Sequence, residues 1–84
     1  MTLDQLRPGS TATITHVAWD RLAPEEALRL RALGVDTGAQ VTIAHRGVFG
    51  GRDPIAITLG RMTVALRRVH AAAMQIAPDA GAAA

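Results

Sequence analysis

Three histidines and one serine, His16, His45, His70 and Ser10, are the side chains of this sequence best suited to metal binding or nucleophilic chemistry. The histidines fall in three separate segments, and no two of them share the short spacing that is typical of metal ligands. A strong site needs three or four converging ligands, and the chain has no cysteine to supply a thiolate. We therefore expect surface or strand-end histidines and no convergent metal site. The alternative that stays open is adventitious Zn²⁺ or another divalent ion at one histidine, completed by solvent or a second molecule.

Catalytic groups are sparse. No pattern in the sequence places a histidine and a carboxylate around Ser10, and Glu25-Glu26 and Asp53-Pro54 fit a helix start and a turn. The glycine-rich stretch 47–51 lacks the lysine and the following helix of a phosphate-binding loop. Because catalysis requires an acid, a base and a nucleophile in one place, we predict that the protein is not an enzyme and has no intrinsic cofactor.

Two aromatic residues are better candidates for contact with another protein. Phe49 lies between Val48 and Gly50 in a glycine-bounded loop, where it either anchors a partner or packs onto the mouth of the fold. Trp19 precedes the expected helix, where it either covers the seam between that helix and the sheet or contacts a partner. We predict partner contact for Val48, Phe49 and Gly50, and include Trp19 in the same set.

Arginine supplies all nine basic residues, which are set against seven acids and give a formal net charge of +2. This small excess is a weak electrostatic signal for nucleic-acid binding. Arg61, Arg67 and Arg68 cluster around the last expected hairpin. They form either a solvated face or a surface that meets acidic groups or phosphate, and we add them to the predicted partner-binding set.

The elements that must position these residues are short. A chain of 84 residues makes one domain and buries only about 60% of the surface that its unfolded form exposes. Alternating, β-branched segments predict five strands, at 11–17, 40–45, 54–59, 62–66 and 74–76. Thr2 and Gln5 have capping-box spacing and predict a helical turn at the start of the chain.

One α-helix is predicted between the first two strands. Pro24 suits its first position, Gly34 its end, and Glu25 and Arg29 have the spacing of an i,i+4 ion pair. The predicted fold class is mainly β: a small five-stranded SH3-like barrel with this inserted helix and the short N-terminal turn. We expect one domain over 1–77 and a flexible alanine-rich tail over 78–84.

The alternation also predicts which side chains form the core. His16 lies two residues after inward-facing Ile14, which predicts a half-buried histidine, and His45 keeps the parity of Val41 and Ile43. The expected core consists of Leu6, Ala12, Ile14, Val17, Leu30, Leu33, Val41, Ile43, Ile55, Ile57, Val64, Leu66 and Ile76.

Four segments then occur in one order along the chain. They are Leu3-x-x-Leu6-x-x-Gly9, then Arg29-Leu30-x-x-Leu33-Gly34-x-x-x-Gly38 before a strand, then a glycine-rich hairpin ending in Asp53-Pro54-Ile55, and finally Val64-Ala65-Leu66-Arg67 leading to Ala72-x-Met74-x-Ile76. Together, over residues 2–77, they resemble the FeoA family of small cytosolic accessory proteins in bacterial ferrous iron uptake.

The resemblance implies an SH3-like barrel that docks on FeoB, a membrane Fe²⁺ transporter with a cytosolic GTP-hydrolysing domain, and modulates it. It implies a cytoplasmic protein, recruited to the inner face of the membrane by its partner, and a weak or metal-bridged dimer stays open. Direct membrane insertion is not expected, because no apolar stretch approaches about 20 residues. Two alternatives stay open: a metal-responsive SH3-like regulatory module and a small nucleic-acid-binding barrel.

Overall fold

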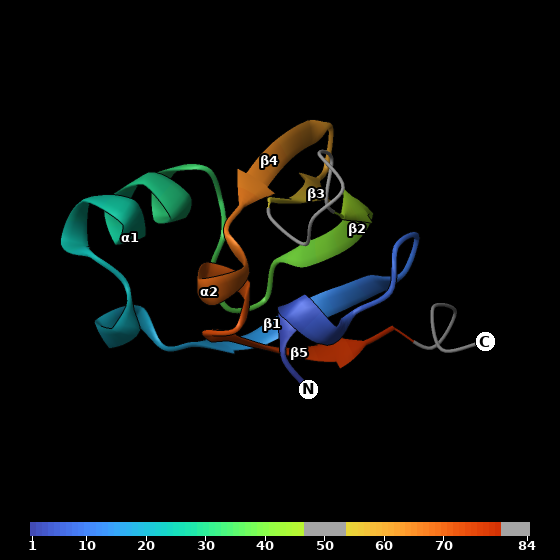
Figure 1. The fold of residues 1–84 in the computed structure, drawn as a ribbon, viewed down its shortest axis with the longest axis horizontal. Coiled ribbons are helices and arrows are strands. Elements are labelled where there is room, and N and C mark those ends of the chain that lie inside the picture. Colours follow the sequence, from blue (N-terminus) through green and yellow to red (C-terminus); the bar gives the residue numbers. More distant parts are fainter. Residues whose placement is uncertain (47–53, 80–84) are drawn as a thin grey trace.

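The computed structural model describes residues 1–46 and 54–79. The elements in chain order are η1 (Leu3–Gln5), β1 (Thr11–Val17), η2 (Trp19–Arg21), α1 (Pro24–Ala32), β2 (Gln40–Arg46), β3 (Ile55–Leu59), β4 (Met62–Leu66), α2 (Arg68–Ala71) and β5 (Met74–Pro78). Val48, Phe49 and Gly50 lie outside the described residues, as does most of the predicted tail. Figure 1 shows α1 to one side of the sheet and α2 directly after β4.

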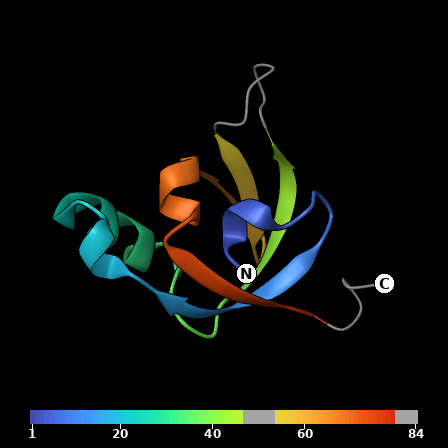
Figure 2. The same ribbon diagram turned by 60° about the horizontal axis from the view of Figure 1, so that its bottom comes forward.

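The five strands form one antiparallel sheet in the order β4-β3-β2-β1-β5, which confirms the predicted mainly β fold with a helix between the first two strands. Strand β1 pairs with β2 only over residues 11–13, whereas it pairs with β5 over residues 12–17. The sheet is curled, and Figure 2 shows β1 and β5 running at a steep angle to β2 and β3. Curling brings one face of the sheet around a single apolar core.

A register shift in β1 corrects one prediction about a histidine. In β1 the shift lies between Ile14 and His16, so that Thr15 and His16 are both exposed and Val17 returns to the core. The prediction of a half-buried His16 was wrong because a bulge adds one residue and reverses the side-chain alternation. The pairing of β2 with β3 has a similar shift between Ile43 and His45, and the prediction for the His45 side chain falls outside the described residues.

The core agrees with the predicted one at every position but Leu33, which is only partly buried where it packs against the core from the end of α1. Sequence periodicity alone missed several buried residues that follow turns or lie in short helical segments. These are Leu3, Leu22, Val35, Ala56, Ala71, Ala73 and Met74.

Helix α1 begins and ends where the sequence predicts. Pro24 occupies its first turn, and Gly34 at its end has a φ of +103°, a left-handed conformation that glycine adopts without strain. The Gly34 N–H donates to the Arg31 carbonyl at 3.1 Å and the Val35 N–H to the Leu30 carbonyl at 2.9 Å. These are the two bonds of a Schellman motif, and the Leu30 and Val35 side chains that they bring together are both buried.

The N-terminus covers the outer edge of β5. The Thr2 N–H donates to Gln5 Oε1 at 3.0 Å, as the capping-box spacing predicts. The Ile76 N–H donates to the Met1 carbonyl at 2.9 Å, and Thr2 forms an isolated bridge with Gln75. Strand β5 therefore has backbone partners on both sides, β1 on one and the start of the chain on the other.

Strand β5 also runs two residues further than predicted, to Pro78. The next residue, Asp79, donates its N–H to the Thr11 carbonyl at 3.0 Å and accepts a bond from Thr13 Oγ1 at 3.2 Å, which extends the pairing with β1. Neither α1 nor α2 has the length and apolar character that crossing a bilayer would require, and no other helix of that kind occurs in the described part of the chain.

Candidate functional site

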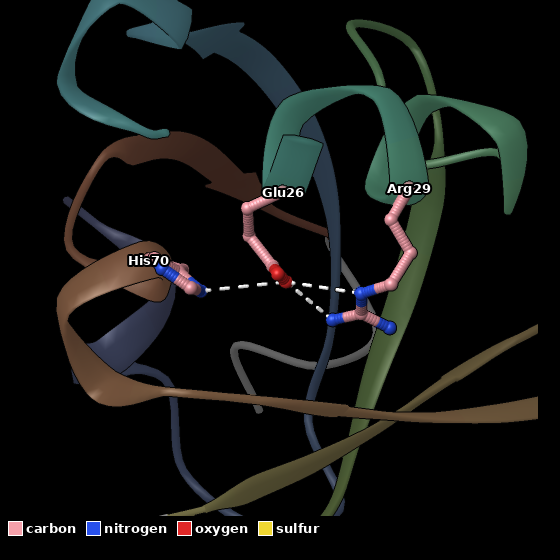
Figure 3. A network of polar contacts seen from close by, with 3 residues as sticks. All are labelled: Glu26, Arg29 and His70. Atoms are coloured by element: carbon pink, nitrogen blue, oxygen red, sulfur yellow. Dashed lines mark hydrogen bonds and ion pairs between the residues drawn. The ribbon is translucent and has the colours of Figure 1, made fainter. Parts of the chain in front are cut away.

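A polar cluster joins the inserted helix α1 to the short helix α2. Glu26, in the first turn of α1, directs its carboxylate between Arg29 of the same helix and His70 of α2 (Figure 3). Its Oε1 accepts one hydrogen bond from Arg29 Nε at 3.1 Å and a second from Nη2 of the same guanidinium. The same oxygen lies 3.8 Å from His70 Nδ1.

The predicted i,i+4 pair was Glu25 with Arg29, and the structure pairs Arg29 with Glu26 instead, at i,i+3. Glu25 is exposed, whereas Glu26 is half-buried on the side of α1 that faces α2. His70 and Arg67, both from the α2 segment, add positive potential on that side and favour Glu26 as the paired carboxylate. Helix spacing permits either pair, so the choice comes from the tertiary structure.

His70 has an unusual environment for a surface histidine. Its side chain is 17% exposed, and its Nδ1 is a buried atom with no hydrogen-bond partner among residues 1–46 and 54–79. At 3.8 Å the Glu26 oxygen is too distant for a direct hydrogen bond, although it is within ion-pair range when the imidazole is protonated.

Glu26 has a perturbed ionisation. The Arg29 hydrogen bond holds the pKa of the Glu26 carboxyl below its ordinary value of 4.5, against an opposing effect of desolvation, with smaller electrostatic contributions from His70 and Arg67. In turn the Glu26 hydrogen bond raises the pKa of the Arg29 guanidinium. Both shifts keep the pair charged at neutral pH.

The three histidines do not come together. His16 is exposed on β1 opposite Gln75, His70 lies on α2, and the backbone of His45 pairs with Ala56 on β2 and β3. Among residues 1–46 and 54–79, no group of three or more histidine, cysteine, aspartate or glutamate side chains could hold a metal ion. Glu26 and His70 supply two such groups, with the Arg29 cation already bound to the carboxylate.

The three predicted arginines occupy both ends of one strand. Arg61 lies in the turn between β3 and β4, and Arg67 and Arg68 directly follow β4. All three are exposed. Because a strand advances about 3.3 Å per residue, the backbones of Arg61 and Arg67 are roughly 20 Å apart. They frame β4 and do not form one compact cluster, and their part in partner binding stays a prediction.

Trp19 is half-buried in η2 and packs against the core. The Arg31 guanidinium carbon lies 4.9 Å from the centre of its ring, a cation–π arrangement between η2 and α1. The ring therefore contacts both the core and the inserted helix. Whether Trp19 also contacts a partner stays a prediction.

Two exposed aliphatic side chains were missed by the sequence reasoning. Leu28 on α1 is 71% exposed and Val69 on α2 is 66% exposed, the largest fractions among the exposed large hydrophobic residues of the described chain. A helical wheel could have found Leu28, which falls outside the stripe of Ala27 and Leu30. Isolated exposed apolar residues are common, but two on the helices that flank the sheet are candidates for contact with a protein.

The sequence profile of the FeoA domain matches residues 1–78. This chain belongs to the FeoA family. A comparison with curated protein sequences gives no significant match. The family assignment therefore rests on the domain profile and on the solved structures of FeoA proteins.

The FeoA protein of Chlorobium tepidum is 28% identical with a TM-score of 0.82, over 96% of this chain and 72% of that one. FeoA of Stenotrophomonas maltophilia, solved in complex with zinc, is 31% identical with a TM-score of 0.70, over 98% of this chain and 93% of that one. The latter is described as a prokaryotic SH3 domain protein and a proposed activating factor of ferrous iron transport. The FeoA family is thus linked to ferrous iron transport, and this member has its SH3-like fold.

The same fold occurs in regulators. A manganese-dependent transcriptional repressor superposes with a TM-score of 0.76 at 22% identity, over 94% of this chain and 41% of that one. At this identity the likeness concerns the fold alone.

Proposed function

We propose that this FeoA-family protein is a non-enzymatic accessory subunit that docks on the cytosolic part of the ferrous iron transporter FeoB and modulates it. The observation that carries the proposal is the match to the FeoA domain over residues 1–78, in a family linked to ferrous iron transport. The protein acts from the cytoplasm and reaches the inner face of the membrane through FeoB.

The described surface supports docking better than chemistry. Glu26 and Arg29 neutralise each other, and Nδ1 of His70 has no hydrogen bond to a hydroxyl in the described structure that would mark a nucleophile and its base. The apolar side chains of Leu28 and Val69 are exposed and the arginines around β4 are solvent-facing, which are features of protein contact surfaces. Modulation then follows if the protein binds one state of FeoB more tightly than another.

The test is a binding titration of the purified protein against the cytosolic part of FeoB from the same genome. Phe49→Ala removes the predicted anchor, and Arg67→Ala removes the predicted orienting charge. Leu28→Ser and Val69→Ser test the exposed aliphatic residues. Arg7→Ala is the matched control, since Arg7 is exposed in the loop before β1. We expect at least one test variant to weaken binding tenfold, about 1.4 kcal/mol, with Arg7→Ala unchanged.

Two failures have different meanings. If the wild-type protein does not bind FeoB, the docking function is wrong. If it binds and all four test variants bind equally well, docking stands and the assigned contact residues are wrong.

A further inference from the structure

Strand β4 is the last strand of the sheet, and no other described strand pairs with its outer side. It pairs with β3 from Met62 to Leu66, and the sheet order continues from β3 to β2, away from this edge. The opposite edge, β5, has Met1 and Thr2 beside it, as described above. Among the described residues, β4 is therefore the one strand that has a backbone neighbour on one side only.

The turn geometry shows which groups those are. Gly60 and Arg61 form a two-residue loop in which Gly60 has a φ of +59°, while no described residue other than glycine has a positive φ. This combination fits a type II′ turn, whose flanking residues Leu59 and Met62 form the first hydrogen-bonded pair. Hydrogen-bonded and non-hydrogen-bonded pairs alternate, so the N–H and C=O groups of Thr63 and Ala65 point away from β3.

Nothing in the sequence of β4 blocks a further strand at this edge. The β3–β4 pairing runs without a register shift, in contrast to the bulged pairings of β1 with β5 and of β2 with β3. Thr63 and Ala65 are small and exposed, and the strand contains no proline and no charged residue. Bulges, prolines and charges are the usual means by which edge strands resist pairing with another chain.

The charges around the edge indicate what it pairs with. Arg61 before β4 and Arg67 and Arg68 after it are the charged residues of the 54–78 stretch, which has no carboxylate. Arg67 acts electrostatically on Glu26, whose carboxylate is already bound to Arg29. Pairing with a second copy of this edge would place arginines next to arginines, whereas a strand with acidic residues at its ends would be attracted at both ends.

We infer that the outer edge of β4 binds an extended, acidic segment of a partner protein as a sixth antiparallel or parallel strand. Backbone hydrogen bonds to Thr63 and Ala65 supply the pairing, and Arg61 and Arg67 select for carboxylates near the two ends of the segment. The inference rests on the proposed docking function, because it names the surface of this protein and the kind of partner segment that would form that contact.

The probe is a synthetic heptapeptide with glutamate at both ends and alternating valine and threonine between them. The two glutamate side chains are then six residues apart, as Arg61 and Arg67 are. A peptide with lysine at both ends is the matched control. Titrated into the ¹⁵N-labelled full chain, the glutamate peptide is expected to shift the amide signals of Thr63 and Ala65 saturably, and to slow their exchange with solvent. The lysine peptide is expected to bind at least tenfold more weakly.

Two variants test the two parts of the inference. Ala65→Pro removes one outward N–H without removing a bond to β3, and should weaken binding at least tenfold. Arg61→Glu with Arg67→Glu should weaken it by a similar factor and reduce its salt dependence. Arg7→Glu with Arg21→Glu makes the same change of charge at exposed residues away from β4 and should leave the shifts at Thr63 and Ala65 in place. If Ala65→Pro does not fold, the charge reversal decides alone.

Binding that leaves Thr63 and Ala65 unshifted, equal binding of the lysine peptide, or equal binding by the charge-reversed variant would each overturn the inference. So would concentration-dependent shifts at these amides without peptide, which would indicate pairing between copies of the chain. Because no FeoB is present, a negative result here leaves the FeoB titration unaffected, and a positive result stands even if FeoB does not bind.

Discussion

Nδ1 of His70 lies 3.8 Å from Oε1 of Glu26, and this approach joins α2, which follows the last hairpin, to α1, which is inserted after the first strand. Helix α1 buries only Leu30 completely, and Ala27 and Leu33 pack against the core as partly buried side chains. The polar cluster therefore adds to a small apolar contact in holding the inserted helix, which carries exposed Leu28.

Glu26→Gln is expected to lower the free energy of unfolding by about 0.5–1 kcal/mol, because a partly exposed ion pair and a charge favourable to the helix N-terminus are both lost. Glu25→Gln removes the same charge one residue earlier at an exposed position and is the matched control, with a change below about 0.5 kcal/mol expected. Urea unfolding at pH 7 measures both. Equal effects of the two substitutions would mean that the pair with Arg29 adds nothing to the dipole effect.

The pH dependence of this contribution has a definite sign. Because the pKa of Glu26 is lower in the folded protein than the ordinary 4.5, the contribution is complete above the unfolded pKa and is lost as the pH falls through the folded pKa. The stability difference between wild-type protein and Glu26→Gln should thus be constant near neutral pH and shrink in acid. The two proteins should also be compared in a His70→Gln background, in which position 70 cannot change its charge and the Glu26 carboxyl accounts for the pH dependence. A difference that grows in acid would contradict this sign.

Leu30→Ala and Leu28→Ala form a second matched pair, since the same atoms are removed from one helix at a buried and at an exposed position. Leu30 is completely buried, and its truncation should cost about 2–4 kcal/mol through lost burial and a cavity. Leu28→Ala should change stability by less than about 0.5 kcal/mol. Thermal or urea unfolding distinguishes them, and similar losses would mean that Leu28 is covered in solution.

Metal binding is expected to be weak and non-stoichiometric. The described residues bring together at most Glu26 and His70, and Arg29 competes for that carboxylate. Anaerobic calorimetry with Fe²⁺ should therefore give no saturable one-to-one heat, and any binding of Zn²⁺ should decline as His16, His45 and His70 are replaced by alanine. One-to-one Fe²⁺ binding that a single one of these substitutions abolishes would contradict the expectation and favour a metal-responsive regulator.

The strands and the helix could be predicted because each has a local cause. β-branched alternation defines β1 and β4 within their observed bounds, and Pro24 and Gly34 mark where α1 begins and ends. The core followed from the same alternation. The exposure of His16 could not be predicted, because a bulge at Thr15 reverses the alternation without any glycine or proline in the sequence to indicate it.

The polar cluster could be predicted only in part. The sequence places a carboxylate near Arg29 by helix spacing, but the choice of Glu26 over Glu25 depends on His70 and on the segment that precedes it, more than 40 residues away in the chain. The predicted strand 62–66 already separates Arg61 from Arg67 and Arg68, whereas the position of this strand at the edge of the sheet required the strand order. Contacts between distant segments decide both features, and single-sequence periodicity contains no information on such contacts.

The most direct test of the proposed role is a calorimetric titration of the cytosolic part of FeoB into this protein in the presence of a metal chelator. We expect saturable binding of defined stoichiometry that the chelator leaves unchanged, since the proposed contact is made by side chains and backbone of the SH3-like sheet. No heat of binding, or binding that appears only when Fe²⁺ or Zn²⁺ is supplied, would contradict a metal-independent docking protein.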